Sequence, residues 1–76
     1  MKEDLREKIA CRLRELRANK KYTLKEVSSI SGVSKDIVWR YENNIVSMQV
    51  DHLKKILEVY GSNLSDFFKE ILAKTQ

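Results

Sequence analysis

The chain has 76 residues, 42% of them apolar, and a formal net charge of +4, so it can build one modest core, and we expect a single domain over residues 1–76. One cysteine excludes an internal disulfide, and a lone histidine excludes a Cys/His cluster of metal-binding spacing. No apolar run approaches the roughly 20 residues of a membrane span and the charged start is unlike a signal peptide, which predicts a cytoplasmic protein without a membrane or metal partner.

The first helix is predicted by an apolar stripe of Leu5, Ile9, Leu13 and Leu16, whose spacings of four, four and three place them on one face. It covers about residues 4–20. A second helix is predicted from Leu24 to near Gly32. The segment TLKE at residues 23–26 is a capping box, and Leu24, Val27 and Ile30 follow at period three.

Three more helices follow from their capping residues. Ser34 can cap a third helix that ends at about Asn43. Ser47 can cap a fourth, from about Met48 to Tyr60, which Gly61 can end in the left-handed conformation. Asn63 can cap a fifth helix that ends at about Ala73. The sequence therefore predicts an all-α protein with five short helices.

The third predicted helix has two distinct faces. At about 100° per residue, Val38 and Tyr41 lie on one side with Ile37 beside them, and these three can face the core. The opposite side carries Lys35, Asp36, Trp39 and Arg40. Mixed charge is usual on a solvated face, but a large aromatic ring there usually has a partner. This face is therefore our candidate binding surface.

The charge is distributed unevenly along the chain. Residues 1–40 carry eleven basic and six acidic side chains, whereas residues 41–76 carry four and five. This distribution favours a polyanionic partner for the N-terminal half, although a small net charge is also common in ordinary soluble proteins.

Nothing in the sequence indicates an enzyme or a cofactor. It has no Gly-rich phosphate loop, no paired carboxylates beside a base, and no nucleophile placed with a histidine in a motif. Cys11 lies opposite the apolar stripe, so we expect it to be exposed; a redox role is conceivable, but no resolving cysteine exists. His52 lies on the polar side of the fourth helix, where a role as ligand or switch is not expected.

Taken together, the motifs resemble the helix-turn-helix domain of phage repressors and Cro-like, XRE-type regulators. The resemblance runs from about Lys8 to Ile71 and rests on their combined order more than on any one motif. The motifs are Leu16-Arg17, TLKEV at 23–27, the turn Gly32-Val33-Ser34, Val38, Tyr41-Glu42-Asn43 and LKKI at 53–56. The resemblance implies a compact five-helix DNA-binding fold with the helix-turn-helix at the second and third helices.

In this family the third helix enters the major groove while the second lies across the DNA backbone. The implied contacts with double-stranded DNA are Thr23, Leu24, Lys25, Ser34, Lys35, Asp36, Trp39, Arg40, Asn43 and Asn44. Arg40 would bind guanine, and Lys35 either guanine or a phosphate. Asp36 would accept a hydrogen bond from cytosine and repel phosphate. Trp39 would supply apolar contact.

The resemblance also implies an ion pair between Arg17 and Glu42, half-buried between the first and third helices. The alternative is that both charges face water. Two departures from the family pattern concern the DNA backbone. Leu24 stands where a phosphate-binding glutamine is common, and Asn44, Ile45 and Val46 replace glycine and basic residues.

The implied function is a sequence-specific transcriptional regulator, a repressor that binds a palindromic operator as a dimer. Restriction-modification controller proteins have a last helix similar to the segment at residues 64–68. Phe67 and Phe68 lie about 100° apart, so we expect Phe68 and Leu72 to form a dimer interface. The alternative is a protein-interaction module that uses Trp39, Ile45 and Val46 as its partner surface.

Overall fold

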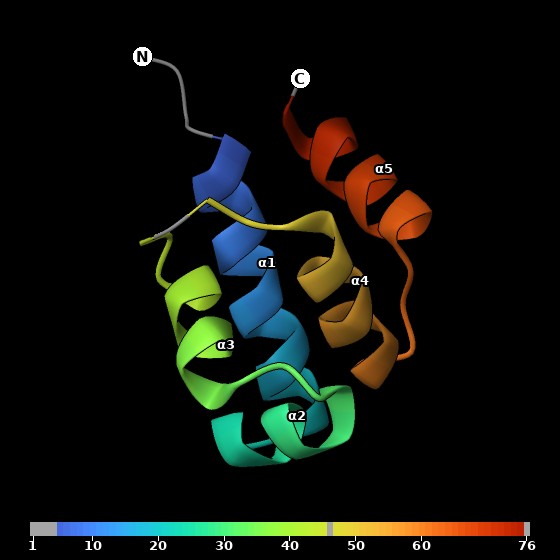
Figure 1. Cartoon of the computed structure of the whole chain (residues 1–76). Coiled ribbons are helices and arrows are strands. Elements are labelled where there is room, and N and C mark those ends of the chain that lie inside the picture. Colours follow the sequence, from blue (N-terminus) through green and yellow to red (C-terminus); the bar gives the residue numbers. More distant parts are fainter. Residues whose placement is uncertain (1–4, 46, 76) are drawn as a thin grey trace.

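The computed structural model describes residues 5–45 and 47–75, and these residues form five α-helices and no strand (Figure 1). In chain order the helices are α1 (Leu5–Lys20), α2 (Leu24–Ser31), α3 (Lys35–Glu42), α4 (Val50–Val59) and α5 (Leu64–Thr75). Helix α1 packs against α3 and α5, α2 against α3 and α4, and α4 against α5. The predicted all-α, five-helix architecture is confirmed.

Three of the predicted helix caps are present. The Thr23 hydroxyl accepts from the Glu26 amide at 3.1 Å, and the Glu26 carboxylate accepts from the Thr23 amide at 2.8 Å, which completes the capping box of α2. The Ser34 hydroxyl accepts from the Ile37 amide at 3.2 Å. Asn63 Oδ1 accepts from the Asp66 amide at 2.8 Å. Each cap satisfies an amide that the first helical turn cannot pair internally.

The cap predicted at Ser47 is wrong. Helix α4 begins at Val50, its N-cap residue is Gln49, and no side chain caps it. The Gln49 amide instead donates to the hydroxyl of the buried Tyr41 at 2.9 Å, and the same hydroxyl is 2.9 Å from His52 Nδ1. The start of α4 is thus held by a tyrosine of α3, a contact between distant residues that local capping rules do not include.

Two residues take the left-handed conformation expected of them. Gly61 follows α4 with φ 72° and Asn44 follows α3 with φ 54°. Asparagine tolerates this region better than most residues with a side chain, because its short amide can hydrogen-bond locally. The substitution of Asn44 for the family's glycine therefore leaves the turn intact.

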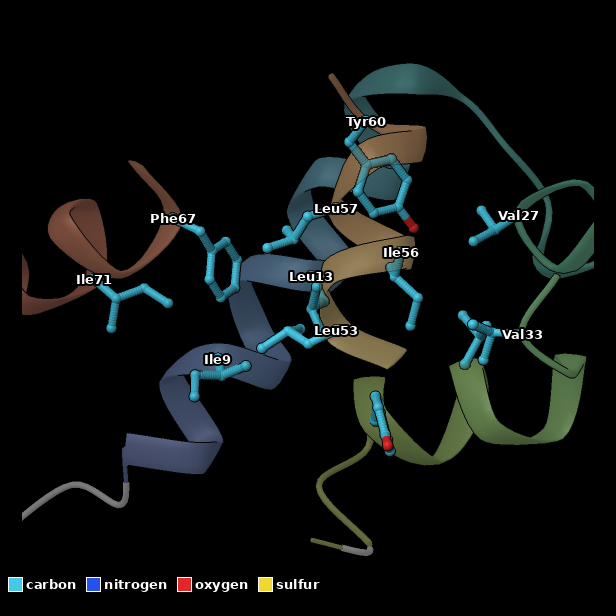
Figure 2. Packing of buried hydrophobic residues seen from close by; sticks show 12 residues of the cluster. Ile9, Leu13, Val27, Val33, Leu53, Ile56, Leu57, Tyr60, Phe67 and Ile71 are labelled. Atoms are coloured by element: carbon cyan, nitrogen blue, oxygen red, sulfur yellow. The ribbon is translucent and has the colours of Figure 1, made fainter. Parts of the chain in front are cut away.

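The core is formed by one buried cluster to which all five helices contribute. Figure 2 shows Leu53 and Leu57 of α4 facing Phe67, and Ile56 facing Val27 and Val33. The buried apolar side chains are Ile9, Ala10, Leu13, Val27, Val33, Val38, Tyr41, Leu53, Ile56, Leu57, Tyr60, Phe67 and Ile71.

Two residues of the predicted apolar stripes lie outside this core. Leu5, in the first turn of α1, is 43% exposed, and Ile30, in the last turn of α2, is 60% exposed. Val33, which follows the turn at Gly32, is buried and supplies the core contact at this end of α2. The predicted stripes included Leu5 and Ile30 because they rest on spacing alone. Spacing does not show that the other helices leave these two helix ends uncovered.

The hydrogen bonds of Tyr41 generate a stability prediction. Replacing Tyr41 with Phe should lower the free energy of unfolding by about 1–3 kcal/mol, because the Gln49 amide and His52 Nδ1 both lose a partner. Urea denaturation followed by circular dichroism measures this change.

Tyr60→Phe is the matched control. The Tyr60 hydroxyl is buried and has no hydrogen-bond partner among the described residues, and burial raises the pKa of this phenol. Removing an unsatisfied hydroxyl should leave stability unchanged or increase it. Equal losses in the two variants would contradict the role given to Tyr41.

Candidate nucleic-acid interface

The outward face of α3 is exposed, as the sequence predicts. Lys35 and Asp36 are exposed, Trp39 is 45% exposed, and Arg40 is half-buried. On the inner face Val38 and Tyr41 are among the largest fully buried side chains. We define the reading face as Lys35, Asp36, Trp39 and Arg40. It combines three charged groups with an indole ring that packs only in part against its own protein.

The turn between α2 and α3 is fixed by the backbone of Gly32 and by the buried Val33. Gly32 adopts φ 81°, a conformation that disfavours residues with a Cβ, and its amide donates to the Ser28 carbonyl at 2.9 Å. The amide of the buried Val33 donates to Ser31 Oγ at 3.0 Å. These bonds and the burial of Val33 fix the direction in which α3 leaves the turn.

An ion pair connects the end of α3 to α1. Arg17 Nε donates to Glu42 Oε2 at 2.8 Å, and Arg17 Nη2 donates to Glu42 Oε1 at 3.0 Å. The Glu42 side chain is 3% exposed and that of Arg17 is 27% exposed. The hydrogen bond to Glu42 raises the pKa of Arg17. The predicted half-buried pair is confirmed, and its two parallel bonds restrict the angle between the helices.

Further bonds connect the same region. Arg17 Nη1 donates to the Tyr22 carbonyl at 3.1 Å, and Arg14 Nη1 donates to the Glu42 carbonyl. We call this set, Arg14, Arg17, Tyr22 and Glu42, the α1–α3 clamp. Arg14 was not among the residues predicted from the sequence, although it lies three residues before Arg17 and therefore on the same side of α1.

The start of α2 presents backbone amides and a basic side chain. Thr23 oxygens accept from the amides of Glu26 and Val27, so the capping interactions leave the amides of Leu24 and Lys25 for an acceptor outside the helix. The Lys25 side chain is exposed. The partly buried Leu24 side chain packs against the core, so the polar group that this residue can offer an acceptor is its backbone amide.

Asn43 and Asn44 direct their amide groups toward their own protein. Asn43 Nδ2 donates to the Trp39 carbonyl at 2.8 Å, within the last turn of α3. Asn44 Nδ2 donates to Glu7 Oε1 of α1 at 3.3 Å. In this structure the two side chains stabilise the end of α3 and do not extend the reading face.

The reading face contains an ion pair that the sequence analysis did not identify. Arg40 Nε donates to Asp36 Oδ2 at 2.8 Å, and both side chains are substantially exposed. Their separation of four residues along a helix was an available signal, since such residues are neighbours on its surface.

The other candidates occupy different parts of the surface. Cys11 is exposed, as predicted, while His52 is half-buried and binds Tyr41. Among the described residues no group of three or more His, Cys, Asp or Glu side chains could hold a metal ion. No described helix is both long and apolar enough to cross a membrane. Val46 lies outside the described residues.

The sequence matches known helix-turn-helix regulators. The family model HTH_3, described as helix-turn-helix, matches residues 13–67, which include the whole segment from Thr23 to Asn44. The HTH-type transcriptional regulator PuuR of Escherichia coli (strain K12) is 34% identical over 59 residues. The match covers 78% of this chain and 32% of PuuR. The Shigella flexneri PuuR gives the same values, so the chain spans about a third of the length of these relatives.

Solved structures share the fold. The clp gene regulator ClgR from Corynebacterium glutamicum has a TM-score of 0.84 and 25% identity, covering 99% of this chain and 80% of that one. An HTH_3 family transcriptional regulator from Vibrio cholerae has a TM-score of 0.77 and 27% identity, over 87% and 37% of the two chains. A mutant of the restriction-modification controller protein C.Esp1396I has a TM-score of 0.82 over 97% and 94%; at 18% identity it shows the fold alone.

The α1–α3 clamp generates the prediction of this subsection. Arg17→Ala should lower the free energy of unfolding by about 2–4 kcal/mol, because it leaves a buried carboxylate without its charged partner. Glu42→Ala should also destabilise, but less, because Arg17 is more exposed and its guanidinium can be hydrated. Chemical denaturation of each variant gives both values.

Arg12→Ala is the control, since Arg12 is in the same helix and has a similarly covered side chain. Its partners Glu15 and Glu70 are 53% and 47% exposed, so its loss should cost about 0–1 kcal/mol. Denaturation midpoints that stay at the wild-type value for Arg17→Ala and Glu42→Ala would show that the clamp contributes no more than a surface contact.

Proposed function

We propose that this chain binds a specific operator as a homodimer and represses transcription there. The proposal starts from its family, because the chain belongs to the HTH_3 helix-turn-helix family of DNA-binding transcriptional regulators. The reading face of α3 is the observation that carries this proposal. Lys35, Asp36 and the Trp39 ring are exposed on the element that enters the major groove in helix-turn-helix proteins, and Arg40 beside them is half-buried. Repression needs no further activity, since a protein bound over a promoter excludes polymerase.

Within the reading face, the side chains differ in what they can recognise. The guanidinium of Arg40 can bind O6 and N7 of guanine with two hydrogen bonds. Lys35 can reach either a guanine or a phosphate. The Trp39 ring can contact a thymine methyl group, which would cover the apolar area that its own protein leaves exposed.

The helix starts supply the contacts with the DNA backbone. The first-turn amides of α2 and α3 carry the positive ends of the helix dipoles and suit phosphate oxygens. Thr23, Lys25 and Ser34 are exposed beside these amides, and Leu24 contributes its backbone. Asn43 and Asn44 would contact phosphate only by giving up their present hydrogen bonds. The contacts with the DNA backbone should therefore come mainly from the starts of α2 and α3.

A protein partner is the second candidate for this surface. Trp39 is 45% exposed and Ile45, shortly after the same helix, is 52% exposed. Exposed apolar residues close in the chain are typical of protein interfaces. The salt dependence distinguishes the two functions, because phosphate binding releases counterions and weakens steeply with added salt.

Dimerisation through α5 rests on Leu72 more than on Phe68. Phe67 is buried, and Phe68 packs edge-on against it with ring centroids 5.5 Å apart, so Phe68 is already half-covered within one chain. Leu72 is 51% exposed one turn later. A two-fold axis beside α5 would bury both side chains against their copies.

The dimer is tested by replacing Leu72 with Glu, which places a charge at the proposed interface without entering the core. We expect light scattering at micromolar concentration to give a dimer mass for the wild type and a monomer mass for the variant. Ile30→Glu, at an exposed residue of α2, should leave the mass unchanged. A monomeric wild type would overturn this part of the proposal.

DNA binding is tested by titrating operator and scrambled duplexes, with the operator taken from a selection among random duplexes. Arg40→Ala should weaken operator binding by about 1–3 kcal/mol and relax the preference at one base pair. Lys35→Ala should either do the same or weaken binding to all sequences alike with a lower salt slope. Trp39→Ala should weaken binding without altering the circular dichroism spectrum.

Lys69→Ala removes a positive charge from an exposed residue of α5 and serves as the control. It should change operator affinity little compared with Lys35→Ala. Equal and salt-insensitive affinities of the wild type and all variants for both duplexes would favour the protein-partner function.

A further inference from the structure

Asp36 and Arg40 are paired with each other across one turn of the reading face. The bond joins Arg40 Nε to Asp36 Oδ2 at 2.8 Å, and the two side chains are 42% and 66% exposed, respectively. In a chain that does not contact DNA, such a pair would contribute only weakly to helix stability. Its position among the groups proposed to contact bases gives it a second consequence.

The bond to Asp36 uses the Nε edge of the Arg40 guanidinium and leaves its terminal edge available for another acceptor. With Nε donating to Asp36, the two terminal nitrogens Nη1 and Nη2 form the unoccupied end of Arg40, which has no other partner among the described residues. This end carries parallel N–H groups that match two neighbouring acceptors. Guanine presents such a pair, O6 and N7, in the major groove.

Arg17 and Arg12 also form ion pairs, but they use their guanidinium groups differently. Arg17 donates through Nε, Nη1 and Nη2 to Glu42 and Tyr22. Arg12 donates through Nη1 and Nη2 to Glu15 and Glu70. Both of these place their terminal nitrogens on their own protein, whereas Arg40 is held at Nε and its terminal nitrogens have no partner among the described residues.

We propose that Asp36 is a positioning residue that holds Arg40 with its terminal nitrogens directed at guanine, and that Asp36 thereby determines specificity at the base pair Arg40 contacts. This inference rests on the proposed DNA-binding function. It differs from the sequence-based expectation that Asp36 itself accepts a hydrogen bond from cytosine. An unpaired Arg40 could swing toward a phosphate or toward the acceptors of other bases, while the bond to Asp36 restricts it.

The charge of Asp36 contributes in the same direction. A carboxylate beside the guanidinium repels phosphate oxygens, so the pair is attracted less to the DNA backbone than a lone arginine would be. Removing the carboxylate should therefore reduce discrimination between sequences and strengthen binding to unrelated duplexes. A residue with only a structural role would change affinity for all duplexes alike.

The test is a selection of bound sequences from random duplexes, followed by titration, for the wild type, Asp36→Ala, Arg40→Ala and the double variant. The wild type should select guanine at one base pair. Asp36→Ala should reduce that preference by roughly 5- to 150-fold, the range of one two-bonded base contact, without lowering affinity for scrambled duplexes. Arg40→Ala should remove the preference at the same base pair, and adding Asp36→Ala to it should change nothing further there.

Three more variants separate positioning from other roles. Asp36→Glu keeps a carboxylate four residues before Arg40 and should retain the guanine preference, whereas Asp36→Asn keeps the size without the charge and should lose part of it. Lys69→Ala, at an exposed residue of α5 outside the reading face, should leave the preference at that base pair unchanged. The thermal midpoint of Asp36→Ala should stay near the wild-type value, because the pair is exposed.

The outcomes distinguish failure of this inference from failure of the proposed function. If Asp36→Ala alters only a different base pair and its effect adds to that of Arg40→Ala, Asp36 reads a base directly and the inference is overturned. Unchanged preferences in Asp36→Ala also overturn it. A wild type that selects no sequence overturns the proposed function and this inference together.

Discussion

The ion pair between Arg17 and Glu42 determines how this small domain presents its third helix. Glu42 is the last residue of α3 and is buried, so its carboxylate requires a partner at a fixed place. Arg17 supplies that partner from α1 and also binds the Tyr22 carbonyl just before α2, while Arg14 binds the Glu42 backbone. One buried charge thus connects α1, the start of the helix-turn-helix and the end of α3.

The two faces of α3 follow from this arrangement. The inner face is held by the clamp, by Val38 and by the hydroxyl of Tyr41, which also holds the start of α4. The outer face can therefore carry residues that contribute little to folding. In the proposed function, an indole and an ion pair that are both partly exposed on a helix held in this way would lose little conformational freedom when they bind another molecule.

Local sequence rules predicted most of the fold. The caps at Thr23, Ser34 and Asn63 and the left-handed Gly61 depend on neighbouring residues, and the structure confirms them.

The cap predicted at Ser47 failed because the start of α4 depends on Tyr41, eight residues before Gln49. The stripes failed at Leu5 and Ile30 because burial depends on what covers a helix end, which periodicity does not contain. The exposed face of α3 could be predicted from helical geometry. The Arg14 contact and the hydrogen bond from Asn44 to Glu7 could not, because they depend on how α1 lies against α3.

The most direct test of the account is a titration of isotope-labelled protein with an operator duplex, followed by the chemical shifts of the backbone amides. The largest changes should fall at residues 23–25 and 34–40, with small changes along α5. The amides around Arg17 and Glu42 should keep the chemical shifts of the free protein, because α3 is already held at its binding angle. Changes centred on α4 and α5, with the amides of residues 34–40 unaffected, would contradict binding through α3.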